Sequence, residues 1–136
     1  MVPFWPDMAK NHSGPTKAVN DFAQAFDAVG KIVVFSKSLD RAEGKNTTIV
    51  RANLRDEILK LKQEPGKNIM VGGVDLPSQL MELDLIDEYR FVVQPLLAGE
   101  GRRLLEGISL PARLPLKLVE TKILKSGSVA LRYLKP

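Results

Sequence analysis

Residues that could bind an anion gather at three places in this chain, and the first is the pair Gly72-Gly73. The pair follows a short apolar run at residues 69–71, where we expect a strand, and precedes a helix that Asp75 can cap and whose first turn suits Pro77. Glycine lets a ligand approach the backbone, and the amides at the start of a helix attract phosphate. The pattern predicts either a phosphate-binding turn or only a tight strand-to-helix turn.

The second place is the tripeptide Ser36, Lys37 and Ser38. It follows the apolar run at residues 32–35, which is typical of a strand covered on both faces. Ligands of open α/β sheets lie outside the carboxyl ends of the strands, and two hydroxyl groups beside an ammonium group can bind a phosphate. The other interpretation is a solvated polar turn.

The third place is a loop that contains Pro95, Gly99 and Gly101 and runs into Arg102 and Arg103. Proline removes a donor from a strand ladder, and the glycines allow the loop to bend sharply. Such a loop could close its arginines onto an anionic substrate. It could equally be a long surface loop.

Composition excludes several classes of function. The chain has 136 residues, no cysteine and one histidine, so we expect one domain over residues 1–136, no thiolate chemistry and no metal site. The net charge of +4 and the aromatic content of 6% do not indicate a nucleic-acid-binding surface. No membrane-spanning run or signal peptide is expected, and a cytoplasmic protein fits the absence of cysteine.

The remaining pattern predicts a mixed α/β sheet. We expect irregular structure at residues 1–14, a helix at residues 15–29 capped near Ser13 or Gly14, and a helix from residue 53 or 54 to residue 62 whose charged side chains, Arg55 and Lys62 among them, are solvated. The expected strands are residues 32–35, 48–51, a segment within 85–93, and an antiparallel pair at 116–123 and 129–133 joined by a hairpin turn.

Two adjacent carboxylates, Asp87 and Glu88, lie at the start of the strand expected within residues 85–93. Neighbouring residues of a strand point to opposite faces, so the two do not share a proton. We therefore expect a structural role for both of them.

Several stretches, taken in order, carry a family resemblance. They are Phe4-Trp5-Pro6, Val34-Phe35-Ser36-Lys37-Ser38-Leu39, Asn46-Thr47-Thr48, Leu61-Lys62 with Pro65-Gly66, Gly72-Gly73, Leu85-Ile86-Asp87-Glu88, and residues 95–104 and 126–133. Together they resemble the dihydrofolate-reductase-like family, in particular the C-terminal reductase domain of the bifunctional riboflavin-biosynthesis deaminase-reductase. The similarity extends over nearly the whole chain.

The resemblance implies a three-layer α/β sandwich with a mixed, mainly parallel central sheet and a C-terminal antiparallel hairpin. It also implies a homodimeric, NADPH-dependent reductase of a pyrimidine- or pteridine-like heterocycle, similar to 5-amino-6-(5-phosphoribosylamino)uracil reductase. Hydride would pass from the nicotinamide to the substrate, and no catalytic residue is assigned, because an ordered water is an equal candidate for the proton donor.

The same resemblance assigns the binding residues. The adenosine ribose and its 2′-phosphate fall to Ser36, Lys37 and Ser38. The pyrophosphate falls to Gly72 and Gly73 with the amides of Val74, Asp75 and Leu76. The nicotinamide and substrate lie beside the loop that contains Pro95, Leu97, Gly99 and Gly101.

The chain departs from the family pattern in two ways. Gly44 stands where many relatives have a tryptophan, and the sequence starts after the strand, the Ser-Leu-Asp-Gly-like turn and the helix with which relatives begin. Without that strand, ladder groups and apolar surface would be exposed, so we expect the chain to pair its open edges, to dimerise extensively or to fold loosely. The alternative function is a non-catalytic dimeric nucleotide-binding or interaction module, or an inactive fragment of a longer reductase.

Overall fold

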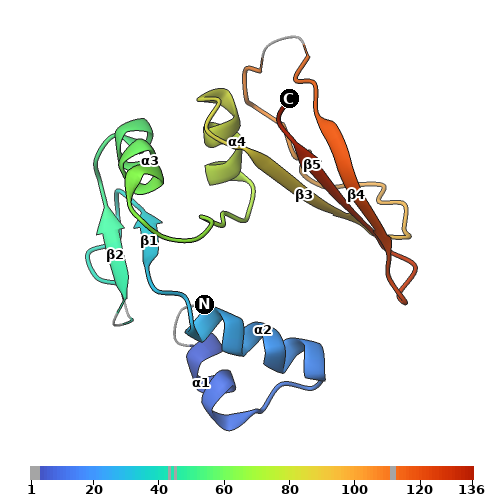
Figure 1. Ribbon diagram of the computed structural model, residues 1–136, viewed down its shortest axis with the longest axis horizontal. Helices are drawn as coiled ribbons and strands as arrows, with labels where there is room; N and C mark the ends of the chain where they lie inside the picture. The colour runs from blue at the N-terminus through green and yellow to red at the C-terminus, as the bar shows by residue number, and fades with distance from the viewer. Residues whose placement is uncertain (1–3, 43, 45, 111–112) are drawn as a thin grey trace. The chain divides into compact units, whose positions relative to one another are not determined.

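The structure is a computed structural model that describes residues 4–42, 44, 46–110 and 113–136. Its contacts gather into two compact units, Met1–Leu54 and Arg55–Pro136. Each unit has its own sheet, and the elements of both are labelled in Figure 1. No helix of the described residues is long and apolar enough to cross a membrane.

Two helices, α1 (Phe4–Asn11) and α2 (Lys17–Asp27), pack together in the first unit. Trp5 of α1 lies edge-on to Phe22 of α2, with ring centroids 4.7 Å apart, and Ala23 is fully buried. The expectation of irregular structure at residues 4–11 was therefore wrong. Tertiary packing of an aromatic cluster overrode weak local propensity there, and Pro6 is tolerated because it lies in the first turn.

Helix α2 begins and ends inside the expected range of 15–29, and its cap is Thr16 instead of Ser13 or Gly14. The Thr16 hydroxyl accepts a hydrogen bond from the Val19 amide at 3.3 Å. The amide side chain of Asn20 bonds both the N–H and the C=O of Gly14, at 2.8 and 3.3 Å. These bonds keep Gly14 outside the helix.

The sheet of the first unit consists of β1 (Ile32–Phe35) and β2 (Thr47–Val50), which run parallel. Ile32 pairs with Thr47 and Phe35 with Val50, so both strands end at the same edge. Strand β1 is confirmed where it was expected, and β2 begins one residue earlier than predicted. Every residue of β1 is half-buried, whereas the apolar run suggested full burial.

The second unit contains two helices and an antiparallel sheet of order β3-β5-β4 (Figure 1). Its elements are α3 (Leu54–Gln63, whose first residue closes the first unit), α4 (Asp75–Glu82), β3 (Glu88–Val93), β4 (Lys117–Ile123) and β5 (Val129–Leu134). Helix α3 and the hairpin of β4 and β5 confirm the sequence prediction. The hairpin turn has Gly127 at φ 84° and a hydrogen bond from the Leu124 amide to the Ser128 carbonyl.

The strand expected at residues 69–71 is not formed. Ile69 is 51% exposed and Met70 is 82% exposed, and no described strand pairs with this segment. An extended segment without a neighbour gains no ladder hydrogen bonds and buries little apolar surface. Among the described residues the strands accordingly form two sheets, one parallel and one antiparallel, instead of one mainly parallel sheet.

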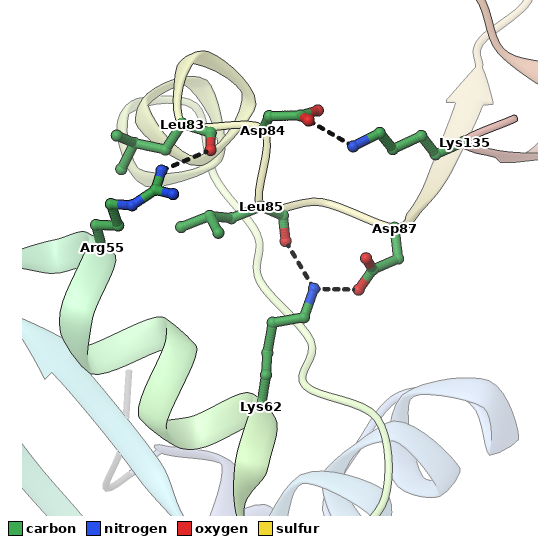
Figure 2. Close-up of polar contacts among 7 residues, drawn as sticks. All are labelled: Arg55, Lys62, Leu83, Asp84, Leu85, Asp87 and Lys135. Carbon is green, nitrogen blue, oxygen red and sulfur yellow. Dashed lines mark hydrogen bonds and ion pairs between the residues drawn. The ribbon is translucent and has the colours of Figure 1, made fainter.

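The connection between α4 and β3 is held by basic side chains on both sides (Figure 2). Lys62 of α3 bonds the Asp87 carboxylate at 2.5 Å, and Lys135 bonds the Asp84 carboxylate at 2.6 Å. Arg55 and Lys62 also donate to backbone carbonyl groups of this connection, at 3.4 and 3.3 Å. The expectation that Arg55 and Lys62 only face solvent was wrong, because the turn after α4 offers them carbonyl and carboxylate acceptors.

The two faces of the antiparallel sheet differ in character. One carries aromatic rings, with Phe91 6.2 Å from both Tyr89 and Tyr133 between ring centroids. The other carries Glu88, whose carboxylate bonds Arg90 at 2.5 Å and lies 3.1 Å from Arg132. The guanidinium of Arg132 also pairs with Glu120, whose carboxylate lies 3.4 Å from Arg132 Nη1. Glu88 thus has the structural role that the sequence predicted.

Candidate functional site

The Gly72-Gly73 turn leaves its backbone open. Gly73 has a φ of +89°, a conformation that favours glycine, and a Cβ added at either glycine would meet no atom within 4 Å. A ligand can therefore approach the main chain closely at this point.

The start of α4 supplies amide groups to this turn. The residue that caps the helix is Val74, which has no side-chain acceptor, and the first helical bond runs from Ser78 N to Val74 O at 3.0 Å. Within the described part of the chain, the amides of Val74, Asp75 and Leu76 donate no hydrogen bond. The expectation that Asp75 caps the helix was wrong, because Asp75 is already the first helical residue. Its side chain is thereby available for another contact.

That contact is an ion pair with Arg102, whose Nη2 lies 2.7 Å from Asp75 Oδ1. The hydrogen bond to Asp75 raises the pKa of the Arg102 guanidinium. Arg102 belongs to the glycine-containing loop that the sequence singled out as a possible anion clamp. The structure therefore brings two of the three predicted places together, within the second unit.

The chain beyond Arg102 runs along one face of α4. The buried hydroxyl of Ser78 donates to the Leu104 carbonyl at 3.3 Å, and Glu82 Oε1 accepts from the Ser109 amide at 2.5 Å. Asp75, Ser78 and Glu82 are spaced three and four residues apart, so they lie on the same side of the helix. Together with the Arg102 ion pair, these contacts form a seam between α4 and residues 102–109.

The predicted substrate loop is anchored at its start and exposed at its centre. The Ser128 hydroxyl donates to Gln94 Oε1 at 2.8 Å, and the Pro95 ring lies 3.5 Å from the position of a Cβ at Gly127. Leu97 is fully exposed, Gly99 is exposed, and Gly101 has a φ of +139°. The loop thus presents an apolar side chain to solvent between two fixed ends.

In the first unit, Ser36 lies directly after β1 and organises the turn that follows. Its hydroxyl accepts from the Leu39 amide at 3.1 Å, while its own amide bonds the Val50 carbonyl at 3.3 Å. Lys37 and Ser38 are exposed. An ammonium and a hydroxyl group on an ordered turn are suitable donors for a phosphate.

Sequence reasoning missed Arg51, which supports the same turn. Its guanidinium donates to the Leu39 carbonyl and lies 3.3 Å from the Asp40 carboxylate. The available signal was its position: Arg51 follows β2, and two parallel strands bring their carboxyl ends to one edge. The same argument could have paired Arg51 with the turn at Ser36.

A cavity of about 490 Å³ lies elsewhere in the second unit. Its lining is mostly apolar and includes Met81, Tyr89, Phe91 and Leu105, with Arg113 as the charged member. None of the residues that the sequence assigned to ligand binding lines it. The cavity is therefore separate from the candidate cofactor site. Its mainly apolar lining also does not suit a polyphosphate.

Residues 4–130 match the family described as the RibD C-terminal domain. The chain belongs to this family. The resemblance to the reductase domain of riboflavin biosynthesis is thereby confirmed, and the family is associated with reductase activity in that pathway.

Two curated relatives come from Bacillus subtilis (strain 168). The uncharacterized protein YyaP is 35% identical over 104 residues, which cover 76% of this chain and 54% of YyaP. The uncharacterized protein YwjB is 34% identical over 85 residues, which cover 62% of this chain and 49% of YwjB. The chain spans about half the length of the curated relatives it matches.

A solved structure supports the fold. It is a crystal structure from Shewanella sp. PV-4 of a protein whose name provisionally assigns it to riboflavin biosynthesis. The TM-score is 0.68 at 18% identity, with 88% of this chain and 71% of the other chain covered. The mixed α/β architecture is therefore that of a known fold.

Proposed function

We propose that the chain is an NADPH-dependent reductase of a pyrimidine- or pteridine-like heterocycle, of the 5-amino-6-(5-phosphoribosylamino)uracil reductase type. The observation that carries the proposal is the turn at Gly72 and Gly73, where open backbone meets amides that bond no other described group. In a member of the RibD C-terminal domain family, this turn fits the pyrophosphate of a dinucleotide. For the complete fold we propose the three-layer dihydrofolate-reductase-like sandwich.

The chain's own residues would bind and orient the cofactor, which supplies a hydride when bound. The amides of Val74, Asp75 and Leu76 would hold the pyrophosphate. Lys37 and the hydroxyl groups beside it would hold the 2′-phosphate of the ribose. Both assignments rest on the same chemistry, since amide, ammonium and hydroxyl groups all donate hydrogen bonds to phosphate oxygens.

The loop between Pro95 and Gly101 would cover the substrate and exclude water. The exposed side chain of Leu97 is available to lie against a flat heterocycle, and the two glycines permit the loop to adjust. No protein group is assigned as the proton donor. A water molecule held under the closed loop would serve this role.

Cofactor preference tests the proposal. Isothermal titration of the wild-type chain should show tighter binding of NADPH than of NADH, because Lys37 gains a charge-assisted contact only with the 2′-phosphate. Lys37→Ala should lose about 1.5–3 kcal/mol of NADPH binding, on the order of ten- to a hundredfold, with NADH unchanged. Equal affinity of the wild type for the two cofactors would contradict the proposal.

A second candidate is a nucleotide-binding module without catalysis. The observation that favours it is the absence of a strand at residues 69–71, where the exposed Ile69 and Met70 indicate an incomplete sheet. Steady oxidation of NADPH in the presence of an aminouracil ribose phosphate would support the reductase. NADPH binding with no turnover of any such substrate would support the module.

A further inference from the structure

The start of helix α4 carries a carboxylate that would repel a pyrophosphate. Asp75 is the first residue of the helix, and its side chain is 74% exposed. A helix N-terminus attracts negative charge, so a carboxylate there already uses part of that attraction. It also repels a second anion over the few ångströms that separate them. Alone, Asp75 would weaken phosphate binding at this turn.

Arg102 offsets the negative charge of Asp75 by forming an ion pair with it. Its Nη2 lies 2.7 Å from Asp75 Oδ1, a distance at which the two formal charges largely cancel for a ligand nearby. The Arg102 side chain remains 52% exposed. Because the pair is exposed, it contributes little to folding stability, and its removal should leave the protein folded.

Backbone and side-chain contacts on the carboxyl side of Arg102 hold this residue near α4. The seam along α4 holds Leu104 on Ser78 and Ser109 on Glu82, at 3.3 and 2.5 Å, so the chain on the carboxyl side of Arg102 is fixed to the same helix face as Asp75. On the amino side, Gly101 at φ +139° turns the chain. Arg102 therefore reaches Asp75 from a fixed backbone.

We propose that Arg102 supports anion binding at the turn formed by Gly72 and Gly73: by neutralising Asp75, it keeps the turn attractive to the pyrophosphate of a dinucleotide. Arg102 acts through Asp75 and is a positioning residue in this sense. The inference rests on the proposed function, because the proposed cofactor supplies the pyrophosphate. The loop that begins at Pro95 would thus serve both ligands, with its centre beside the substrate and its end at Arg102 beside the cofactor.

A double-mutant cycle tests the inference. Four chains are compared by isothermal titration with NADPH and, separately, with inorganic pyrophosphate: wild type, Arg102→Ala, Asp75→Asn and the double variant. Arg102→Ala should bind both probes roughly two- to tenfold more weakly, the size expected for one exposed charge at a helix terminus. Asp75→Asn should bind at least as tightly as wild type, and the double variant should recover wild-type affinity.

Two further variants separate charge from packing. Lys60→Ala removes one positive charge from an exposed side chain of α3 that has no ion pair in the described part of the chain, and should change affinity little. Arg102→Lys should retain most of the affinity. The deficit of Arg102→Ala should shrink at high salt, as an exposed charge effect must.

The outcomes are distinct. If Arg102→Ala binds like wild type, or if the double variant stays as weak as Arg102→Ala, the inference is overturned. If wild type binds pyrophosphate with the expected pattern but not NADPH, the proposed function fails and the role of Arg102 stands. If wild type binds neither probe, both are overturned.

Discussion

At the scale of single residues, Gly72 offers the cleaner test of the proposed cofactor turn. Its φ lies outside the left-handed region and a Cβ there meets no atom within 4 Å, so Gly72→Val should leave the melting temperature unchanged. The new side chain would block a pyrophosphate from the backbone. We expect affinity for NADPH to fall by roughly ten- to a hundredfold in calorimetry, the loss of one or more charge-assisted hydrogen bonds.

Gly73→Val is the informative comparison. Its φ of +89° is unfavourable for any side chain, so this variant should lose about 1–2 kcal/mol of stability or more in addition to its affinity. Normal NADPH binding by Gly72→Val would show that the pair of glycines makes only a turn.

Residue types and short motifs located the glycine turn, the serines and lysine after β1, and the arginine-bearing loop. They could not supply the partners of these residues. The ion pair of Asp75 with Arg102 joins positions 27 residues apart, and the bonds of Arg51 to residues 39 and 40 require the register of two parallel strands. The parallel pairing of the strands could have placed Arg51 near the turn at Ser36, but spacing along the sequence does not reveal which atoms it bonds or that Asp75 meets Arg102.

At the scale of elements, the charged face of the antiparallel sheet predicts a dependence of stability on pH. Arg90 first, and then Arg132, lowers the pKa of the Glu88 carboxyl below its ordinary value of 4.5. The folded chain therefore holds this proton more weakly than the unfolded chain. The resulting stabilisation is present above the ordinary value and is lost as pH falls through the lower pKa of the folded state.

Denaturant unfolding of wild type and Glu88→Gln between neutral and acidic pH measures this effect. The wild type should be the more stable of the two near neutral pH, and the difference should narrow as the pH falls below about 4.5. Glu100→Gln, which removes an exposed carboxylate outside the network, serves as the control and should follow wild type. Parallel curves for wild type and Glu88→Gln would refute the prediction.

The elements with strong local signals were predictable, and those that depend on neighbours were not. Helix α3 and the β4–β5 hairpin follow from periodicity and from a glycine turn. Helix α1 forms because Trp5 packs on Phe22 and Phe26, which no local rule indicates. Residues 69–71 have the apolar character of a strand but pair with no described strand, and pairing decides whether a strand forms.

At the scale of the whole molecule, we propose that the chain is a homodimer whose interface includes β4. This strand is one of the two edges of its sheet, and all seven of its residues are exposed. Leu118 is 50% exposed and Ile123 is 78% exposed, which leaves apolar side chains beside an unpaired ladder. Natural proteins cover or blunt such edges, and a second copy of the chain would do so.

Light scattering at micromolar concentration should give twice the mass of one chain. We expect the interface to bury on the order of 1,200–2,000 Å² in total, the size of a specific protein–protein interface. Leu118→Glu and Ile123→Glu should yield folded monomers, because both side chains already face solvent in the single chain and a charge there costs its fold little. Leu131→Glu should unfold the chain instead, because Leu131 is half-buried on β5 directly opposite Phe91. Lys122→Glu, at an exposed polar position of the same strand, is the matched control and should remain dimeric. A monomeric wild type would refute the dimer, and a dimer that survives both glutamate substitutions on β4 would place its interface on another surface.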